Sequence, residues 1–131
     1  MTLPNSVEAA IIAHARRDRP SECCGLLLGV SDAIVEAVPL ANAAEDPERR
    51  YFIEPAAYLK VLRAARQRSL DVIGVYHSHP RSTATPSPTD AAEGFGNFIF
   101  LIVGLSVAPP ELTAWTWADG NFTPIPIVRS P

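Results

Sequence analysis

The sequence predicts a mixed α/β fold, in which helices flank a largely antiparallel or mixed β-sheet. Two segments have the one-sided apolar spacing of helices, and several short apolar or alternating runs have the spacing of strands. Hydrophobic residues make up 47% of the chain and charged residues 19%, which is typical of a globular protein. At 131 residues the chain is most simply one domain, so we expect a single domain over residues 1–131.

The first half of the chain is predicted to hold both long helices and the first strands. A helix over residues 6–18 is expected to begin with Ser6 as its cap and to end at Arg19-Pro20. Pro55 favours the start of a second helix over residues 55–69. Between the helices we expect strands over residues 23–30, 33–40 and 51–53. The expected inward side chains are Val7, Ala10, Ile11 and His14 in the first helix, and Tyr58, Leu59, Leu62 and Ala65 in the second.

The second half begins with the strand that we expect at the centre of the sheet. Residues 72–79 are apolar on both faces at their start, which is typical of a strand that is covered on both sides. A loop over residues 80–87 and a short helical turn from Pro88 are expected next. Later strands are expected over residues 97–103, 112–117 and 121–128, with the Asp119-Gly120 pair as a tight hairpin turn before the last one.

Composition and charge argue against several classes of function. The net charge of −3 gives no electrostatic reason to expect binding to nucleic acid or to an anionic membrane. No apolar run approaches the roughly 20 residues of a membrane-spanning helix, and the first residues do not resemble a secretion signal. Cys23 and Cys24 are adjacent and poorly placed to form a disulfide with each other. We therefore expect free thiols packed in a strand, and a cytoplasmic location.

Two histidines lie at the end of the predicted central strand. Because residues i and i+2 of a strand point to the same face, His77 and His79 are expected to project together, with Ser78 turned away. Pro80 cannot continue a central strand, so the strand is expected to end just beyond them. Two neighbouring imidazoles are able to bind one metal ion. The alternative interpretation is a pair of ordinary polar residues at a strand exit.

A serine and an aspartate follow after the loop. Ser87, Pro88 and Asp90 have the order of a helix cap, a first helical residue and a third one, so capping alone explains both polar side chains. A capped turn is also a stiff support for a carboxylate ligand. Zinc held by two histidines, one aspartate and water is the catalytic type of zinc site, since its fourth position stays open to exchange.

Such a site needs a base that takes a proton from the zinc-bound water. No acidic residue lies in a suitable position on the central strand or in its loop. The best candidate is Glu22, which directly precedes the apolar run CCGLLLG. The alternative interpretation of Glu22 is a solvated carboxylate before a strand, where glutamate is common.

These residues resemble the signature of the JAMM metalloproteases, also called MPN-plus domains. The signature is an upstream glutamate followed by His-x-His-x(7)-Ser-x(2)-Asp, and it is matched here by Glu22, His77, His79, Ser87 and Asp90. The resemblance covers about residues 5–128. It implies a curved β-sheet with helices on both sides, similar to that of the cytidine deaminases. Deaminase chemistry itself is not expected, because the Pro-Cys-x-x-Cys half of that zinc site is absent.

The resemblance also implies a role for each residue of the signature. His77, His79 and Asp90 would bind one Zn²⁺ per chain. Glu22 would act as general base and then as acid, and Ser87 would donate a hydrogen bond to the developing oxyanion. The implied reaction is hydrolysis of a peptide or isopeptide amide. Long insertions of the eukaryotic deubiquitinating members are missing, so the chain is more similar to compact bacterial members, which are linked to trimming the C-termini of ubiquitin-like sulfur-carrier proteins.

Other functions stay open at this point. Related domains serve as non-catalytic MPN-type interaction modules, which typically lose ligands that this chain retains, or occur with phage-tail cell-wall hydrolases. A structural zinc would have four protein ligands, and the sequence offers three. The basic residues of the second helix are expected to be solvated or, alternatively, to dock an acidic partner, and the late aromatic pair is expected in the core. These residues are Lys60, Arg63, Arg66 and Arg68, and Trp115 and Trp117.

Overall fold

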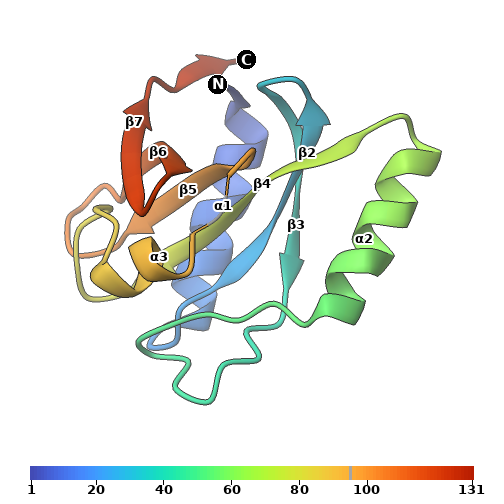
Figure 1. Cartoon of the computed structure of the whole chain (residues 1–131). Coiled ribbons are helices and arrows are strands. Elements are labelled where there is room, and N and C mark those ends of the chain that lie inside the picture. The colour runs from blue at the N-terminus through green and yellow to red at the C-terminus, as the bar shows by residue number, and fades with distance from the viewer. Residues whose placement is uncertain (95) are drawn as a thin grey trace.

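The computed structural model describes residues 1–94 and 96–131, and in them one mixed sheet has helices on both faces (Figure 1). The strands are β1 (Thr2–Pro4), β2 (Cys24–Val30), β3 (Ala33–Leu40), β4 (Asp71–His79), β5 (Ile99–Gly104), β6 (Glu111–Ala118), β7 (Asn121–Ile125) and β8 (Val128–Ser130). The helices are α1 (Asn5–Asp18), α2 (Pro55–Gln67) and α3 (Pro88–Ala92). The strand order is β7-β6-β5-β4-β2-β3-β1-β8. β4 pairs in parallel with β5, and β1 with both its neighbours, which confirms the mixed sheet.

The first helix starts differently from the prediction. α1 begins at Asn5, directly after β1, and Pro4 occupies the cap position without a side-chain hydrogen bond, so the prediction of Ser6 as the cap is wrong. The prediction of an inward side chain is also wrong at two positions: Ala10 is exposed, and Leu59 of α2 is 45% exposed. The remaining inward residues are buried or half-buried, as predicted.

Two of the expected strands differ for local reasons. Residues 51–53 form no strand, because Phe52 exchanges hydrogen bonds with Asn42 and Ala43 of the same connection. The strand expected over residues 121–128 is interrupted around Pro126, which has no amide hydrogen to offer a sheet. Its last part is β8, which pairs with β1 at the opposite edge of the sheet from β7.

An apolar layer lies on each face of the sheet. The α1 layer includes the buried face of α1, and the α2 layer includes Ala65 of α2. Both cysteines are buried as free thiols, as predicted, and burial raises the pKa of Cys23 to about 11 and that of Cys24 to about 12. Trp115 and Trp117 are half-buried against the α2 layer. Buried members of the two layers include Leu3, Ile11, Leu27, Tyr76 and Leu101 for α1, and Leu26, Leu28, Val75 and Phe100 for α2.

A β-bulge in β4 determines which face its last residues occupy. Leu27 pairs with Gly74 but Leu28 pairs with Val72, so Ile73 is an extra residue on the β4 side. Beyond the bulge, Val75 belongs to the α2 layer and Tyr76 to the α1 layer. By the alternation of strand side chains, the two histidines that end β4 lie on the α2 face and the serine between them lies on the α1 face. The histidines thus share one face and the serine is turned away, as predicted.

The loop over residues 80–87 is fastened to β5 and β6. The amide of Ala84 donates to Glu111 Oε1 at 3.0 Å, and its carbonyl accepts from the hydroxyl of Thr113. Ala84 is fully buried, and a Cβ on Gly104 would lie 2.5 Å from its backbone nitrogen. Gly104 therefore allows the loop to cross the end of β5, next to the histidines.

Replacing Gly104 by alanine is expected to lower the free energy of unfolding by about 2–4 kcal/mol, because the added methyl group meets backbone that is fixed on both sides. Gly96→Ala is the matched control, since the nearest atom to a Cβ at Gly96 lies 4.0 Å away. Urea denaturation of the two variants measures the difference. Equal stability of the two variants would show that the loop is not fastened here.

Candidate metal centre

Three ligand-type side chains meet where β4 ends and α3 begins. The Nε2 atoms of His77 and His79 are 3.2 Å apart, and Asp90 Oδ2 lies 3.3 Å from the first and 3.1 Å from the second. Both histidines are buried, and the side chain of Asp90 is 10% exposed. In the described part of the chain these residues form a group of His, Cys, Asp or Glu side chains that fits a metal ion. The structure thus brings together three residues that the sequence singled out.

The first turn of α3 holds the aspartate in place. Ser87 is the cap, and its Oγ accepts from the backbone amide of Asp90 at 3.0 Å, while Asp90 Oδ2 accepts from the amide of Ser87 at 2.9 Å. The indole of Trp117 on β6 donates to the carbonyl of Ala91 at 2.9 Å and fixes α3 against the sheet. The capping interpretation is confirmed, and it leaves the same carboxylate oxygen facing both histidines.

A hydrogen bond to the loop determines which nitrogen of His79 faces the centre. His79 Nδ1 lies 2.8 Å from the carbonyl oxygen of Thr83, and a carbonyl oxygen is an acceptor, so Nδ1 carries the hydrogen. In a neutral imidazole Nε2 then presents a lone pair to Asp90 and His77. Three electron-rich atoms at these distances repel one another unless a proton or a metal cation lies among them.

The ionisation of the three residues reflects this arrangement. Burial lowers the pKa of His77. Burial acts in the same direction on His79, but its bonds to Asp90 and Thr83 outweigh it and raise the pKa of His79 above its usual value. Burial alone would raise the pKa of Asp90, yet the bonds from both histidines and from the Ser87 amide hold that pKa well below its usual range. The centre therefore holds a charged carboxylate, which favours a bound cation.

The dimensions of the group fit zinc. Four ligands at 2.0–2.1 Å around a tetrahedral ion lie about 3.3–3.4 Å from one another, and the three atoms here are 3.1–3.3 Å apart. The bond from His79 Nδ1 to a carbonyl is the outer contact that zinc-binding histidines usually make. His77 is held instead by stacking on Tyr51, with ring centroids 4.5 Å apart and planes inclined by 23°.

Glu22 lies in the segment before β2, and the charges of His79 and Asp90 act on it. It is 5% exposed, and its Oε1 has no hydrogen-bond partner among the described residues. Burial raises the pKa of Glu22 to about 7, and the charges of His79 and Asp90 act on it in opposite directions. The interpretation of Glu22 as a solvated carboxylate is therefore wrong. The adjacent amide, that of Cys23, donates to Ser78 Oγ at 2.8 Å, which ties this segment to β4.

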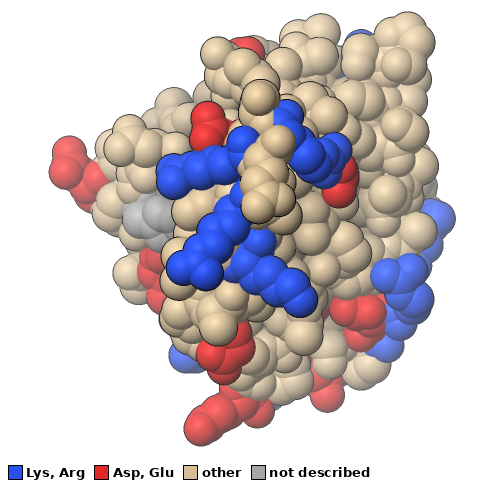
Figure 2. Space-filling model, turned by 90° about the vertical axis from the view of Figure 1, so that its right-hand side faces the viewer, with Lys and Arg blue, Asp and Glu red and all other residues tan. Residues whose placement is uncertain are grey.

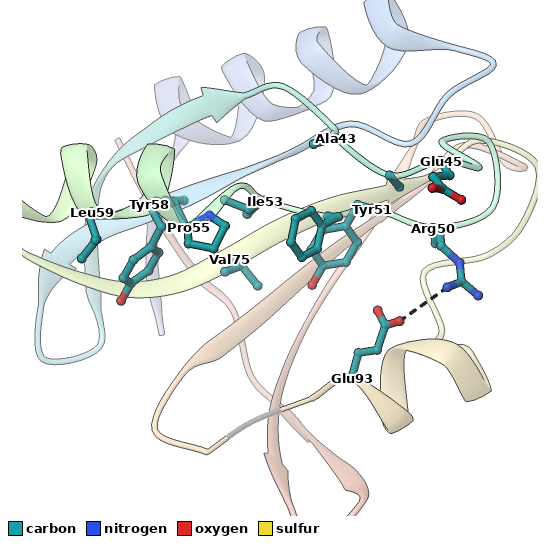
Figure 3. A pocket seen from close by; sticks show the side chains of 13 residues that line it. Ala43, Glu45, Arg50, Tyr51, Ile53, Pro55, Tyr58, Leu59, Val75 and Glu93 are labelled. Carbon is teal, nitrogen blue, oxygen red and sulfur yellow. Dashed lines mark ion pairs between the residues drawn. The ribbon is translucent and has the colours of Figure 1, made fainter.

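An apolar groove lies on the α2 face, and Figure 3 shows the side chains that line it. Its volume is about 950 Å³. Tyr51 lines one part of it and also stacks on His77, so the groove ends beside the candidate ligands. Near that end Arg50 Nη1 lies 3.8 Å from Glu93 Oε1, and this ion pair joins the connection before α2 to α3. Other lining residues are Leu26, Ala43, Ala44, Glu45, Phe52, Ile53, Pro55, Tyr58, Leu59 and Val75.

Several residues that support the centre were not predicted. Thr83 acts through its backbone carbonyl, which any residue carries, so no sequence signal could have identified it. Tyr51 lies far from the histidines in the chain and shows no motif. Asn42 is the one with a recognisable signal, since it is an amide side chain within a polar connection. Its Nδ2 donates to the carbonyls of Glu22, Pro47 and Arg50 and so organises the wall of the groove.

Comparison with known proteins identifies the family. The model of the prokaryotic homologs of the JAB domain matches residues 4–118. The chain belongs to this family. The JAB-family protein is similar to a desampylase from Haloferax volcanii, with 33% identity over 93% of this chain and 91% of the relative. It is 35% identical to the CysO-cysteine peptidase of Mycobacterium tuberculosis, over 90% of this chain and 83% of the relative. It is 36% identical to a probable TtuB-protein conjugate cleaving protease of Thermus thermophilus, over 70% of this chain and 62% of the relative.

Solved structures confirm the fold of this JAB-family protein. A protein from Desulfitobacterium hafniense is similar with a TM-score of 0.90 and 27% identity, over 98% of this chain and 92% of that one. A JAB1/MPN domain protein from Archaeoglobus fulgidus is similar with a TM-score of 0.66 and 18% identity, over 100% of this chain and 97% of that one. The predicted curved mixed sheet with flanking helices is therefore confirmed. In the described residues, no helix has the length and apolar character needed to cross a membrane.

The raised pKa of Glu22 predicts how Glu22→Gln changes the stability of the metal-free protein. The folded state favours the protonated carboxyl. The wild type therefore loses stability as the pH rises from 4.5, the ordinary pKa of the group, to about 7, and its stability stays at the lower level at higher pH. Glutamine has no charge to bury. The variant should therefore match the wild type near pH 4 and exceed it by roughly 1–3 kcal/mol near pH 8.

Urea unfolding in the presence of a chelator, at several pH values, measures this difference. Asp119→Asn, in the exposed hairpin turn, is the control for removal of a carboxylate and should show no such trend. A stability gain for Glu22→Gln that does not depend on pH would contradict the assignment of a raised pKa to Glu22.

Proposed function

We propose that this JAB-family protein is a zinc-dependent hydrolase that cleaves a peptide or isopeptide amide at the C-terminus of a ubiquitin-like, sulfur-carrier protein. The observation that carries the proposal is the group of His77, His79 and Asp90, with ligand atoms 3.1–3.3 Å apart, beside the buried Glu22. The relatives named as desampylase, CysO-cysteine peptidase and TtuB-protein conjugate cleaving protease support this class of reaction.

We assign one zinc ion per chain to this group. His77 and His79 would bind it through Nε2, and Asp90 through Oδ2. When bound, zinc lowers the pKa of its water ligand to about 7 and polarises the scissile carbonyl. A structural zinc would have four protein ligands, whereas this group supplies three. The group is therefore of the catalytic type, with one position left for exchange.

Glu22 is assigned the proton transfers. A general base works best when its pKa lies near the working pH, and burial brings the pKa of Glu22 to about 7. Its unpaired Oε1 is free to accept a proton from water in the centre. The same carboxyl then returns the proton to the amine that leaves when the amide bond breaks. Glu22 is thus a catalytic residue in this proposal.

Ser87 is assigned the hydrogen bond to the carbonyl oxygen of the substrate. Its Oγ already accepts from the amide of Asp90, so its hydroxyl hydrogen remains available to a further acceptor. The serine starts the turn that carries Asp90, which places its hydroxyl beside the centre. Hydrogen bonds of this kind typically lower the barrier by about 3–4 kcal/mol, because they strengthen as negative charge develops on the oxygen.

A purely non-catalytic interaction module fits the structure less well. Such a module has no use for an ionisable side chain buried without a partner, since burial of this kind lowers stability, and Glu22 is buried in that way. Perturbed carboxyl groups in a cleft are typical of catalytic sites. The alternative of a phage-associated peptidase is supported by a 33% identity to the tail tip assembly protein K of Escherichia phage N15, but the match covers 64% of this chain and 32% of that protein. A single domain and a cytoplasmic location stay predictions.

The test combines metal content with cleavage. The protein is incubated with a ubiquitin-like sulfur-carrier protein whose C-terminal carboxyl is joined to cysteine, and the product mass is measured. The wild type should contain close to one zinc per chain and release the amine. Glu22→Gln should keep the zinc and lose about 10²–10⁴-fold in kcat, because the general base is gone. His77→Ala should lose both zinc and cleavage.

His14→Ala is the matched control for His77→Ala. His14 is also a buried histidine, but it lies in the α1 layer, where Nδ1 bonds the Tyr76 hydroxyl at 2.7 Å. The His14→Ala variant should keep the zinc. Normal cleavage by Glu22→Gln, or zinc content of His77→Ala at the wild-type level, would contradict the proposed function.

A further inference from the structure

The outward face of α2 carries a row of basic side chains. Lys60, Arg63, Arg66 and Arg68 are all exposed. In Figure 2, which turns this side toward the viewer, Lys and Arg side chains gather over the helix. Two of them have acidic neighbours, since Arg68 Nη1 lies 2.8 Å from Glu36 Oε1 and Arg66 Nε lies 3.9 Å from Asp71 Oδ1. Lys60 and Arg63 have no ion pair within the described residues.

This charge is unusual for the chain as a whole. The net charge is −3, yet the outward face of α2 has an excess of positive charge. Such a local excess attracts acidic molecules over roughly a Debye length, about 8–10 Å at physiological salt. Lys60 and Arg63 form no ion pair with a carboxylate of the described chain. Their charge is therefore free for a binding partner.

The basic row adjoins the outer end of the groove. Leu59 lines the groove, and Arg63 lies one helical turn beyond it on the same surface. Leu59 is 45% exposed. Figure 3 shows Tyr58 and Leu59 at one end of the groove and Tyr51 nearer the other, where Arg50 and Glu93 pair. An apolar rim of Tyr58 and Leu59, with basic side chains next to it, thus lies at the end away from the metal centre.

We propose that Leu59, Lys60 and Arg63 form the docking surface for the folded body of the protein substrate, and that this body presents acidic side chains to α2. The inference rests on the proposed function. The groove would then hold the extended C-terminal tail between the body on α2 and the centre beside Tyr51. Charge complementarity selects the occupant, because an apolar rim with adjoining cations fits a protein face with aliphatic and acidic side chains. Lys60 and Arg63 determine affinity and have no part in the chemistry.

The test separates the body of the substrate from its tail. The first probe is an acidic ubiquitin-like sulfur-carrier protein that carries a fluorogenic amide at its C-terminus. The second is a peptide of its last residues with the same amide. K60E/R63E should raise KM for the protein about tenfold and leave kcat within about twofold, because rim charges act on association. For the peptide, kcat/KM should stay within about twofold of the wild-type value.

R16E/R19E is the matched control. It makes the same change in net charge at exposed positions of α1 and its end, on the other face of the sheet. It should leave KM for the protein unchanged. Raising NaCl from about 50 to about 500 mM should lower kcat/KM of the wild type for the protein probe and have little effect on kcat/KM of K60E/R63E. Circular dichroism and zinc content show that both double variants are folded.

An equal loss in K60E/R63E and R16E/R19E, or an equal loss for the protein and the peptide, would overturn the docking surface while leaving the hydrolase intact. If the wild type does not cleave the conjugate, the proposed function fails. The docking surface is then tested by binding of the same protein to the zinc-loaded Glu22→Gln variant, with and without K60E/R63E. The proposal requires that K60E/R63E weaken this binding about tenfold. Loss of a dimer in K60E/R63E during size-exclusion chromatography, or tighter binding of an oligonucleotide than of the protein probe, would assign the face to another occupant.

Discussion

Electrostatic repulsion among three atoms is the constraint on which the rest of the structure depends. His77 Nε2, His79 Nε2 and Asp90 Oδ2 are held 3.1–3.3 Å apart, and electron-rich atoms do not settle at such distances without a cation or a proton among them. Each is held from behind, by the Tyr51 ring, the Thr83 carbonyl and the amide of the α3 cap. Because the ligands are fixed before metal binds, binding requires little rearrangement.

The sheet and the ligand group could be predicted because both depend on local rules. Strand alternation places His77 and His79 on one face, and the capping pattern places Asp90 in the first turn of a helix. The apolar start of β4 indicated a strand covered on both sides, and each face does carry an apolar layer. These features follow from short stretches of sequence, so no knowledge of long-range contacts was needed to predict them.

Features that depend on long-range packing could not be predicted. The extra residue Ile73 sets the face of everything that follows it in β4, and nothing in the run of apolar residues indicates it. Glu22 is buried because Ser78 ties its neighbour to β4 across 55 residues of chain. Likewise, the apolar residues 51–53 fit a strand by composition, but Asn42 offers their backbone other partners, and they become a wall of the groove instead.

The central claim is that two imidazoles and one carboxylate hold zinc and leave a position for water. X-ray absorption spectroscopy at the zinc edge of the loaded protein tests it most directly. We expect a four-coordinate ion with nitrogen and oxygen ligands at about 2.0–2.1 Å and the scattering pattern of two imidazoles. A sulfur ligand at about 2.3 Å, which would indicate binding by Cys23 or Cys24, or an ion without imidazole ligands, would contradict the claim.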